Sequence, residues 1–434
     1  MRPKPLLRSL LIKAFLLTFA IGSKLLSGAY AQNYDTNGGF VQTFAGFGEQ
    51  GYVDGQGILT KFSNPLQIVS DIWSNLYVWD SGNHVVRKIT ADANVSTLAG
   101  GGNAFEGQGT NVSFSYYSSV GSMGIDHSNV IWLVAQFGSY PYLLTITPTG
   151  VVSIQNAGPT LTNLSSSSSI CFDSLNNLYY SGGNTIYRYS PITYLSQPFA
   201  GNGTSGLVDG NGIVFPEFAG PAALTCDQAN NIYVWDAGNY RIRRIDQGQN
   251  VTTIAGSPAC NPYCNDVDGK GTNTSFAGNG VASMTADNAG NVYMACSTSV
   301  RKMDAQTNVV TLAGNFTQSS YTNGVPGNLA RFNIAKAICL AQGMVFVADY
   351  NNQRIRVVTF NPTPQVVFAT NLQLGLYPGL QIVGTVGRTY QIQTSPNLTN
   401  WTTRSTILLN SSPYLWMDPS LVGGNKFYRA VLLP

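Results

Sequence analysis

An Ala-Gly pair closes a short β-type run six times within the first 314 residues of this 434-residue chain. The six runs end at Gly46, Gly100, Gly158, Gly201, Gly256 and Gly314. Neighbouring pairs are 43 to 58 residues apart, which is a period typical of radial or solenoid repeats. A single unit of this length cannot bury its apolar faces alone, so each unit must pack against its neighbours.

The units share one order of expected strands. A first strand leads to a tight turn ending in Asn, and an apolar strand follows, as in Asn75-Leu-Tyr-Val-Trp-Asp80 and Asn231-Ile-Tyr-Val-Trp-Asp236. A polar turn, a strand rich in Arg and Ile such as Tyr240-Arg-Ile-Arg-Arg-Ile245, and the Ala-Gly strand complete the unit. Four antiparallel strands per repeat are typical of a propeller blade, so the sequence predicts an all-β fold.

The two ends of the repeat region predict how the ring closes. A sixth unit, at about 335–358, has its first three strands but no Ala-Gly strand after them. The lone strand Phe40-Val-Gln-Thr-Phe-Ala-Gly46 stands before the first complete unit. Pairing this strand with the last unit would leave neither edge open. We therefore expect a six-bladed β-propeller closed by its N-terminal strand.

The stretch Asp80-Ser-Gly-Asn-His-Val-Val-Arg-Lys-Ile89 resembles the NHL repeat, which is named for an Asn-His-Leu run. Asn83-His84-Val85 is the nearest match, and Asp236-Ala-Gly-Asn-Tyr240 and Asp349-Tyr-Asn-Asn-Gln353 are variants of it. The resemblance covers residues 40–360 and implies an NHL-type propeller. The second and third units depart from the pattern, since Gln136–Tyr142 and Ser181–Asn184 lack the Asp-x-Gly-Asn turn.

A second module follows the propeller. Residues 361–369 contain two prolines, which predicts a linker. Several strand-like runs separated by turns follow over 370–434. Gly387-Arg-Thr-Tyr-Gln-Ile-Gln-Thr-Ser395, Asn397-Leu-Thr-Asn-Trp401 and Phe427-Tyr-Arg429 resemble a β module found at the ends of large exported bacterial proteins. We expect a small β-sandwich, which would serve adhesion, sorting, cell-surface association or capping.

Residues 1–31 have the three parts of a secretory signal peptide. A basic start precedes the apolar run from Ala14 to Ile21, and Ala29-Tyr30-Ala31 offers small residues for cleavage before Gln32. We expect the mature protein, 32–434, to be exported, with a propeller over 32–360. Without its first 31 residues the chain has 18 basic and 20 acidic residues, which argues against nucleic acid as a partner. No later apolar stretch is long enough to span a membrane.

Six cysteines are consistent with an oxidising compartment but are too few for a dense disulfide framework. Cys260-Asn-Pro-Tyr-Cys264 is the best candidate pair, because its short loop can bring the two Cβ atoms within ~4 Å. Zinc is a poorer interpretation, because a second pair of ligands at suitable spacing is absent. Cys171, Cys226 and Cys339 lie in apolar runs, and we expect core thiols there.

The links between units and the turns after the second strands should lie on one face of the propeller. These links, at about 47–64, 101–118, 202–220, 257–280 and 315–334, make this loop face the default ligand surface. Its candidate ligand-binding side chains combine carboxylates with aromatic rings that suit sugars or peptide side chains. They are Tyr52, Asp54, Phe105, Tyr117, Asp209, Tyr263, Asp268 and Tyr321.

The carboxylates in these links have two interpretations. Asp54-Gly, Asp209-Gly and Asp268-Gly could form a ring that binds calcium or sugar hydroxyls, or they could be recurring turns, and turns are the simpler account. Asp266 and Asp268 are the most calcium-like pair, but their loop lacks a third carboxylate and a bidentate Glu. We therefore expect no cofactor, with calcium as the alternative. Asp80, Asp236 and Asp349 occupy equivalent positions, so we expect them to cap turns.

Two functions remain open. The first is a secreted, non-enzymatic binding or scaffold protein whose loop face contacts a polysaccharide or a protein. The second is an exported lyase or hydrolase that uses loop carboxylates, with or without calcium, on an extracellular polymer or peptide. Some similar propellers are lyases that bind zinc through several histidines, but His84 and His127 are the only histidines here. Neither stands beside a nucleophile motif, so the sequence favours binding over catalysis and predicts no catalytic residue.

Overall fold

The computed structural model describes residues 39–157, 161, 163–191, 193–257, 265–276, 280–315, 318–324, 327–360, 379–382, 388–397, 399–408, 414–417 and 427–433. These residues belong to two compact units, and the first contains all strands up to Phe360. The predicted cleavage site at Ala31 and Gln32, the linker, Tyr263 and the predicted Cys260–Cys264 disulfide lie outside the described residues. None of the helices within these ranges has the length and apolarity needed to cross a membrane.

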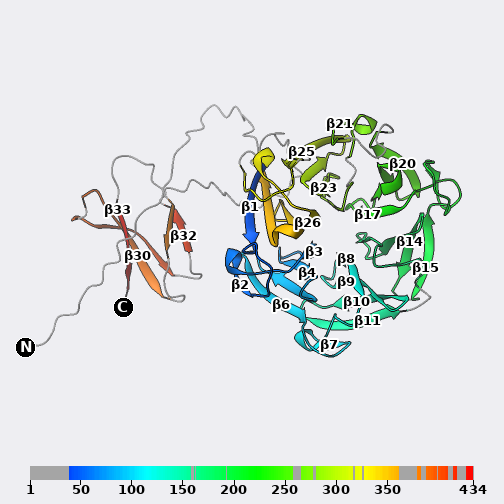
Figure 1. Cartoon of the computed structure of the whole chain (residues 1–434). Coiled ribbons are helices and arrows are strands. Elements are labelled where there is room, and N and C mark those ends of the chain that lie inside the picture. The colour runs from blue at the N-terminus through cyan, green and yellow to red at the C-terminus, as the bar shows by residue number, and fades with distance from the viewer. Residues whose placement is uncertain are drawn as a thin grey trace, which may run out of the picture. The chain divides into compact units, whose positions relative to one another are not determined.

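The first unit is a β-propeller. Its described strands form six antiparallel sheets of four or five strands, which are arranged around a centre in Figure 1. Blade 1 contains β2 (Gly55–Gln56), β3 (Pro65–Ser70), β4 (Leu76–Asp80), β5 (Val85–Ile89) and β6 (Asn94–Gly100). Blade 2 contains β7 (Gly107–Gln108), β8 (Ser119–Ile125), β9 (Ile131–Phe137), β10 (Tyr140–Ile146) and β11 (Val151–Ala157). Blade 3 contains β12 (Ile170–Phe172), β13 (Leu178–Gly182), β14 (Thr185–Ser190) and β15 (Leu195–Ala200).

The remaining blades repeat this plan. Blade 4 contains β16 (Gly210–Asn211), β17 (Pro221–Cys226), β18 (Ile232–Asp236), β19 (Arg241–Ile245) and β20 (Asn250–Ala255). Blade 5 contains β21 (Gly269–Lys270), β22 (Ser283–Ala286), β23 (Val292–Cys296), β24 (Ser299–Met303) and β25 (Asn308–Gly314). Blade 6 contains β26 (Ala335–Ala341), β27 (Met344–Asp349) and β28 (Arg354–Phe360), and β1 (Gly39–Ala45) completes it.

The closure predicted from the sequence is confirmed. β1 pairs antiparallel with β28, with Val41 opposite Val358, and in Figure 1 the blue strand lies in the same sheet as the yellow-orange strands of blade 6. The two ends of the repeat region thereby pair with each other, which removes the open edges.

Blades 1, 2, 4 and 5 contain one strand more than the four predicted. The Gly-rich segment of each link contributes two residues that pair with the outer strand of the same blade, as Gly55 and Gln56 pair with Val95 and Asn94. A 3-10 turn follows, as at Gly57–Leu59. The glycines allow this change of direction, since Gly55 has a φ of 136° and Gly57 a φ of 50°.

A recurring turn joins the first and second strands of a blade. In blade 1, the Asp71 carboxylate accepts the backbone N–H groups of Trp73 and Asn75 at 3.0 and 2.8 Å, and the Tyr77 hydroxyl at 3.0 Å. The same arrangement recurs at Asp173, Asp227 and Asp287, and at Asp126 with Trp132 Nε1 in place of the tyrosine hydroxyl. The Asp-x-x-x-Asn spacing, in which Val130 replaces the Asn after Asp126, thus fixes the turn and also anchors the second strand.

Apolar side chains fill the space between neighbouring blades. Trp79 of blade 1 packs edge-on against Phe114 of the next link, with ring centroids 5.5 Å apart, and Trp235 packs likewise against Phe276 at 5.2 Å. Tyr77, Trp79, Tyr233 and Trp235 are all buried core residues. Aromatic packing of this kind holds each blade to its neighbour.

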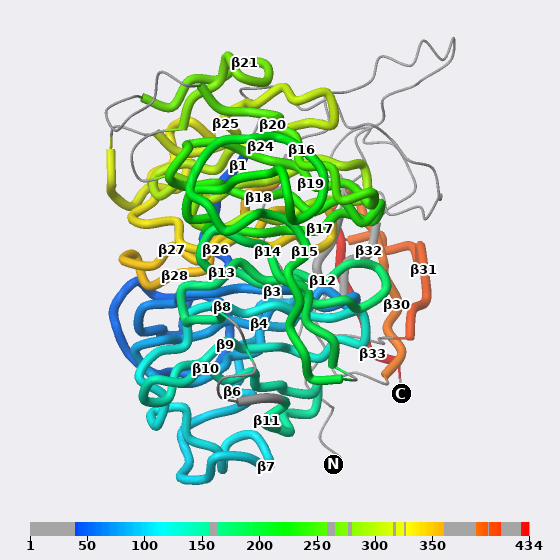
Figure 2. The backbone as a smooth tube through the Cα atoms, turned by 90° about the vertical axis from the view of Figure 1, so that its right-hand side faces the viewer, coloured from blue at the N-terminus to red at the C-terminus, as the bar shows by residue number. Residues whose placement is uncertain are grey.

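The second unit is a small β-sandwich, and Figure 2 traces the backbone of both units. One sheet pairs β29 (Gly379–Ile382) with β32 (Tyr414–Met417), and the other has the order β31 (Thr402–Leu408), β30 (Thr389–Ser395), β33 (Phe427–Leu432). Ile392 is its buried centre among the described residues, and the Arg429 guanidinium lies 4.3 Å from the Trp401 ring.

Candidate functional site: a central pocket and the loop face

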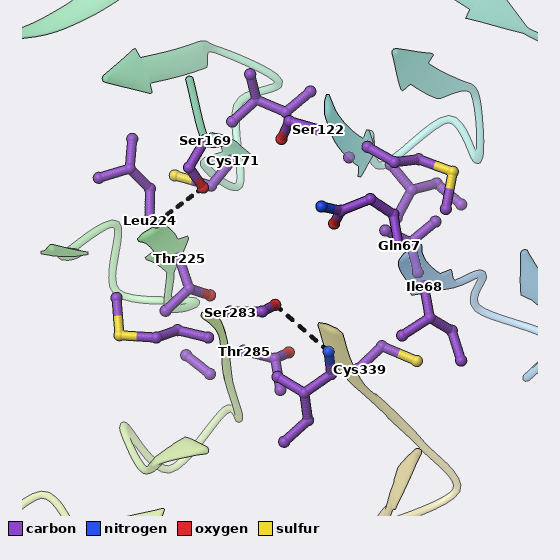
Figure 3. Close-up of a pocket in the computed structure, with 18 of the residues that line it drawn as sticks. Gln67, Ile68, Ser122, Ser169, Cys171, Leu224, Thr225, Ser283, Thr285 and Cys339 are labelled. Carbon is purple, nitrogen blue, oxygen red and sulfur yellow. Dashed lines mark hydrogen bonds between the residues drawn. The ribbon is translucent and has the colours of Figure 1, made fainter. Parts of the chain in front are cut away.

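A pocket of about 990 Å³ lies at the centre of the propeller. Residues from the first strands of all six blades line it, and Figure 3 shows labelled side chains from these strands around an open middle. It is a pocket of the size that binds small molecules in proteins.

The pocket wall is polar but nearly free of charge. Hydroxyl groups come from blades 1 to 5, together with the Gln67 amide; the hydroxyl-bearing residues include Ser70, Ser122, Ser168, Ser169, Thr225, Ser283 and Thr285. Ile68, Leu224 and Ile338 contribute apolar surface between them. Asp287 and Lys336 are the charged residues among those that line the pocket.

Part of this polar wall holds the blades together. The Gln67 amide donates to the Gly121 carbonyl at 2.7 Å, and the Ser70 hydroxyl donates to the Leu340 carbonyl at 2.6 Å. The Ser169 hydroxyl accepts the Leu224 backbone N–H at 2.9 Å. Each of these hydrogen bonds crosses from the first strand of one blade to that of another, so the pocket wall is held in a fixed arrangement.

Other hydroxyls of the wall are available to a ligand. The side chains of Ser122, Thr225 and Thr285 make no hydrogen bond to other residues in the described part of the chain. In Figure 3, Thr225 and Thr285 lie on the side of the pocket opposite Gln67. Unpaired hydroxyls that face one space from several strands are the groups that bind polar ligands.

Three thiols also lie in this wall, namely Cys171, Cys226 and Cys339. Cys171 and Cys339 are buried, as predicted, whereas Cys226 is half-buried. Burial raises the pKa of both Cys226 and Cys339 well above the usual value for a thiol. Both thiols are therefore protonated at neutral pH and are poor nucleophiles.

Hydrogen bonds join the links to the turns that follow the second strands. The links and the turns after the second strands lie together, because the Gly82 N–H donates to the Ser63 carbonyl at 2.8 Å and the Asn83 amide donates to the Gly51 carbonyl at 2.8 Å. The Asp80 carboxylate caps the link through the Ser63 N–H at 2.7 Å. Asp236 and Asp349 accept the N–H groups of Ala219 and Asn333 in the same way, so the predicted capping role of the three aspartates is present.

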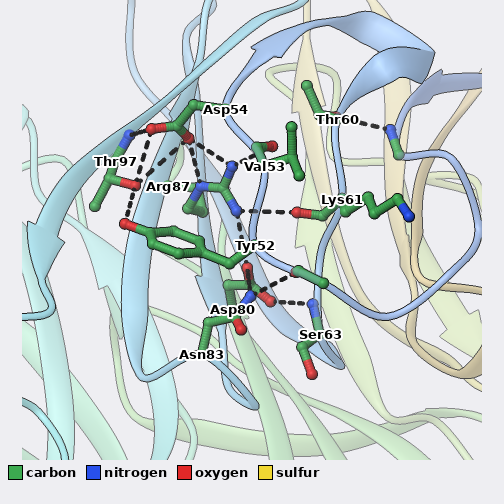
Figure 4. Close-up of polar contacts among 12 residues, drawn as sticks. Tyr52, Val53, Asp54, Thr60, Lys61, Ser63, Asp80, Asn83, Arg87 and Thr97 are labelled. Atoms are coloured by element: carbon green, nitrogen blue, oxygen red, sulfur yellow. Dashed lines mark hydrogen bonds and ion pairs between the residues drawn. The ribbon is translucent and has the colours of Figure 1, made fainter.

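These aspartates also bind arginine, which the sequence reasoning missed. In blade 1 the fully buried Arg87 guanidinium lies between two carboxylates, with Nη1 3.0 Å from Asp80 and Nη2 2.5 Å from Asp54 (Figure 4). It also donates to the carbonyls of Val53 and Lys61 and lies 5.1 Å from the Tyr52 and Phe62 rings. We call this arrangement of a third-strand arginine with link and second-strand acceptors an arginine clasp.

The clasp recurs in three further blades. In blade 4, Arg243 binds Asp236 and Asp209, both at 2.8 Å. In blade 6, Arg356 binds Asp349 at 2.8 Å, and its link partner is the Asn323 side-chain oxygen at 2.9 Å. A fixed spacing of seven residues from Asp to Arg in blades 1, 4 and 6 is the sequence signal that could have revealed it.

In blade 5 the second carboxylate of the clasp comes from the link instead of the second strand. Cys296 stands where the other clasps have their second-strand aspartate, and Arg301 binds Asp268 at 3.0 Å and Asp266 at 3.4 Å. The two residues considered for calcium therefore face a guanidinium. Among the described residues, no group of three or more His, Cys, Asp or Glu is arranged to hold a metal ion.

Burial shifts the titration of the clasp carboxylates. Asp80 is fully buried, and desolvation raises its pKa to about 6, although hydrogen bonds from Asn83, Ser63 and Arg87 oppose this shift. Burial raises the pKa of Asp236 and Asp349 for the same reason. The clasp therefore keeps a carboxylate in an apolar setting where its charge is costly.

The predicted aromatic residues of the loop face divide into two groups. Tyr52 and Tyr321 pack against clasp arginines: the Tyr52 ring lies 5.1 Å from the Arg87 guanidinium, and the Tyr321 ring lies 4.9 Å from the Arg356 guanidinium. Phe105 and Tyr117 belong to a blade 2 cluster without arginine, in which Phe105 is exposed and Tyr117 is buried. The structure thus places the predicted residues that it describes in the links, but it does not bring them into one site.

Comparisons with known proteins agree with the fold. No family model matches the chain. The protein SUPPRESSOR OF QUENCHING 1, chloroplastic, of Arabidopsis thaliana is 24% identical over 330 residues, which are 72% of this chain. The chain spans only about a quarter (26%) of the length of that plant protein.

Two solved structures from Bacteroides thetaiotaomicron are similar in fold. A protein of unknown function gives a TM-score of 0.57 at 20% identity, covering 74% of this chain and 76% of that one. An auxiliary nutrient binding protein gives a TM-score of 0.54 at 18% identity, with the same coverage of 74% and 76%. At these identities the similarity concerns the propeller fold alone.

Proposed function

We propose that this chain is an exported, non-enzymatic binding protein built on an NHL-type propeller, and that its ligand occupies the central pocket. The observation that carries the proposal is the pocket itself, which is about 990 Å³ in volume, is lined by all six blades and carries hydroxyl groups from five of them. Several of these hydroxyls have no partner among the described residues, while Gln67, Ser70 and Ser169 hold the wall rigid. A rigid wall with unpaired polar groups binds a ligand with little loss of conformational entropy.

The ligand that fits this wall is neutral and rich in hydroxyl groups, which favours a saccharide, free or at the end of a polysaccharide. Serine and threonine hydroxyls and the Gln67 amide both donate and accept hydrogen bonds, as sugar hydroxyls do. An anionic or cationic ligand would find a single charge of opposite sign in the wall, at Lys336 or Asp287. The volume suits a short oligosaccharide.

The loop face contributes to this proposal through its aromatic residues. Asp54, Asp209 and Asp268 each hold an arginine, so a ligand would compete with an internal guanidinium for them. This supports binding over the alternative of a lyase or hydrolase that uses loop carboxylates, with or without calcium. The exposed rings remain available to a protein or polysaccharide partner.

Export and surface association complete the proposal. An auxiliary nutrient binding protein shares the propeller fold. We propose that this chain also binds a ligand, and that it does so outside the cell. The C-terminal sandwich, which resembles modules of exported bacterial proteins, would serve surface association, sorting or capping. Mass spectrometry of the protein recovered from the secreted fraction should give a chain that begins at Gln32; a retained residue 1–31 segment would contradict export by this route.

The ligand proposal is tested by calorimetric titration of the purified protein with neutral mono- and oligosaccharides. We expect saturable binding of at least one saccharide. Thr225→Val and Thr285→Val keep side-chain volume but remove hydroxyls from the pocket, and each should weaken binding by about 2- to 10-fold. Thr252→Val is the matched control, because the Thr252 hydroxyl is buried without a partner in β20 and does not line the pocket. Binding unchanged by the pocket variants, or no binding of any neutral saccharide, would overturn this ligand class.

A further inference from the structure

Blade 2 has the frame of an arginine clasp without the arginine. Strand pairing places Leu144 where blades 1, 4, 5 and 6 have their clasp arginine: Leu144 is opposite Leu133 and Ile154, as Arg87 is opposite Val78 and Thr97. The Phe114 ring is buried in the link, as Phe62 is in blade 1. Ala135 takes the place of the second-strand aspartate. The blade therefore lacks both its internal cation and one of the two carboxylates.

The link carboxylate of the clasp is nevertheless retained. Glu106 Oε1 accepts the backbone N–H of Ile154 at 2.5 Å, just as Asp54 Oδ2 accepts that of Thr97 at 3.0 Å. In blade 1 the other oxygen, Asp54 Oδ1, binds the Arg87 guanidinium. Glu106 Oε2 accepts no hydrogen bond from any other residue that the structure describes, and Glu106 is exposed.

Aromatic side chains surround this carboxylate. Phe105 stacks on Tyr116 with ring centroids 4.3 Å apart, and Phe137 meets both Phe105 and Tyr142 edge-on at 6.1 and 6.0 Å. Phe105, Tyr116 and Phe137 are 46%, 40% and 41% exposed, which is unusual for three contacting rings in a soluble domain. They come from the link and from the β9–β10 hairpin, and we call them, with Tyr142 and Glu106, the blade 2 aromatic surface.

A buried hydroxyl without a partner belongs to the same cluster. Tyr117 is 4% exposed, its ring packs on Phe137 and Tyr142, and its hydroxyl has no hydrogen-bond partner. Burial, with the nearby Tyr142 and Glu106, raises the pKa of Tyr117 to about 12. A buried polar atom that lacks a partner is costly, which indicates that a polar group from outside completes this cluster.

The stretch of chain that forms blade 2 contains no cation of its own. Between Lys88 and Arg188 the chain has no lysine or arginine, whereas it has Asp92, Glu106, Asp126 and Asp173. The four clasps define what this scaffold recognises: a guanidinium beside a link acceptor and 4.8–5.2 Å from aromatic rings. A planar guanidinium stacks on aromatic faces and pairs with a carboxylate at the same time.

From these observations we infer that the blade 2 aromatic surface binds an arginine side chain of a partner polypeptide, which supplies in trans the guanidinium that the other clasps contain in cis. The Glu106 carboxylate would pair with the guanidinium, and the exposed rings of Phe105, Tyr116 and Phe137 would stack on it. This surface belongs to the loop face and uses none of the residues that line the central pocket.

The test is titration of the full mature chain with a fluorescent peptide of alternating Gly and Arg, at low and at physiological salt. Peptides with citrulline or lysine in place of arginine separate guanidinium recognition from general attraction of cations. We expect the arginine peptide to bind at least fivefold more tightly than the citrulline peptide, with the lysine peptide between them, and we expect salt to weaken the arginine complex.

Variants locate the binding. Glu106→Gln keeps the acceptor for the Ile154 N–H but removes the charge, and should lower arginine-peptide affinity about 5- to 10-fold; Phe105→Leu should lower it about threefold. Matched controls are Glu49→Gln, an exposed carboxylate of the blade 1 link, and Trp73→Leu, an exposed ring in the turn between β3 and β4. Thermal unfolding followed by circular dichroism verifies that each variant is folded.

Equal binding of the citrulline peptide, or equal losses in the Glu106 and Glu49 variants, would overturn the inference. Saccharide binding in the pocket should be unchanged in all four variants, so failure of this proposal is distinguishable from failure of the pocket proposal.

Discussion

Blades 1 and 4 share four main antiparallel strands with blades 2 and 3, but the two pairs of blades are stabilised by different chemistry. In blades 1 and 4 a buried arginine joins the third strand to the end of the second strand and to the link. In blade 2 the corresponding residues are Leu144 and Ala135, and in blade 3 they are Tyr187 and Gly182. Tyr187 stacks on Tyr180 at 5.2 Å in place of the ion pair.

Because blades 2 and 3 form without it, the ionic clasp is not required for the blade fold. Apolar and aromatic packing completes the same sheet without a buried charge, in agreement with the general finding that hydrophobic replacements of buried ion pairs can be neutral or stabilising. Removing a clasp should therefore lower the stability of the fold mainly when only one of its two charged residues is removed and the other stays buried without a counter-charge.

The largest expected loss of stability comes from removing the arginine of a clasp while its buried aspartate remains. Arg243→Met removes the guanidinium and leaves the fully buried Asp236 without its cation. We expect a loss of about 3–5 kcal/mol in the free energy of unfolding, measured by urea denaturation. Leu144→Met at the equivalent position of blade 2 should cost less than about 1.5 kcal/mol. Similar losses for the two variants would mean that the clasp arginine acts only as a volume-filling side chain.

The junction between blades 2 and 3 should be the next most sensitive point. A Cβ added to Gly121 would lie 1.5 Å from the Ser166 carbonyl oxygen, so β8 would have to separate from the turn that precedes β12. We expect Gly121→Ala to lower the free energy of unfolding by about 1–3 kcal/mol. In Gly248→Ala, the Cβ would meet only side-chain atoms in an exposed turn, at 3.0 Å or more. If both variants unfold at the same urea concentration, the close approach at Gly121 is not a constraint.

The sequence predicted the ring more completely than the site. The Ala-Gly spacing and the missing last strand determined six blades and the closure by β1, because register and edge pairing follow from local pattern. The pocket could not be predicted, because Gln67, Thr225 and Thr285 meet only when blades far apart in sequence close the ring. Asp54 was noted as a candidate ligand, but its partner Arg87 is 33 residues away, and no short motif joins the two.

A double substitution sharpens the comparison further. Asp80→Ala with Arg87→Leu gives blade 1 the residues of blade 2, and it removes both buried charges together. We expect the double variant to be more stable than Arg87→Leu alone, with a residual loss of about 1–2 kcal/mol relative to the natural chain, because Asp54 is exposed enough to be solvated. The measurement is a double-mutant cycle from urea unfolding curves. A double variant that is less stable than either single variant would contradict the view that the two chemistries are interchangeable.

The smallest expected effect is the response of a clasp to pH. Burial raises the pKa of Asp80 to about 6 in the folded chain, above its ordinary value of 3.8. Between these two values the folded chain binds a proton that the unfolded chain does not, so this group's stabilising contribution is fully present below pH 3.8 and is lost as pH rises through 6. Lowering the pH from 7 to 5 should therefore add about 1 kcal/mol to the free energy of unfolding through Asp80 alone.

The Asp80→Asn side chain cannot titrate, so the stability of this variant should lack the increment. The Asp92→Asn variant, which changes an exposed turn, should retain it. Urea unfolding at pH 5 and pH 7 measures the difference, and equal pH responses in the Asp80→Asn variant and the natural chain would mean that the Arg87 guanidinium keeps Asp80 charged at both pH values.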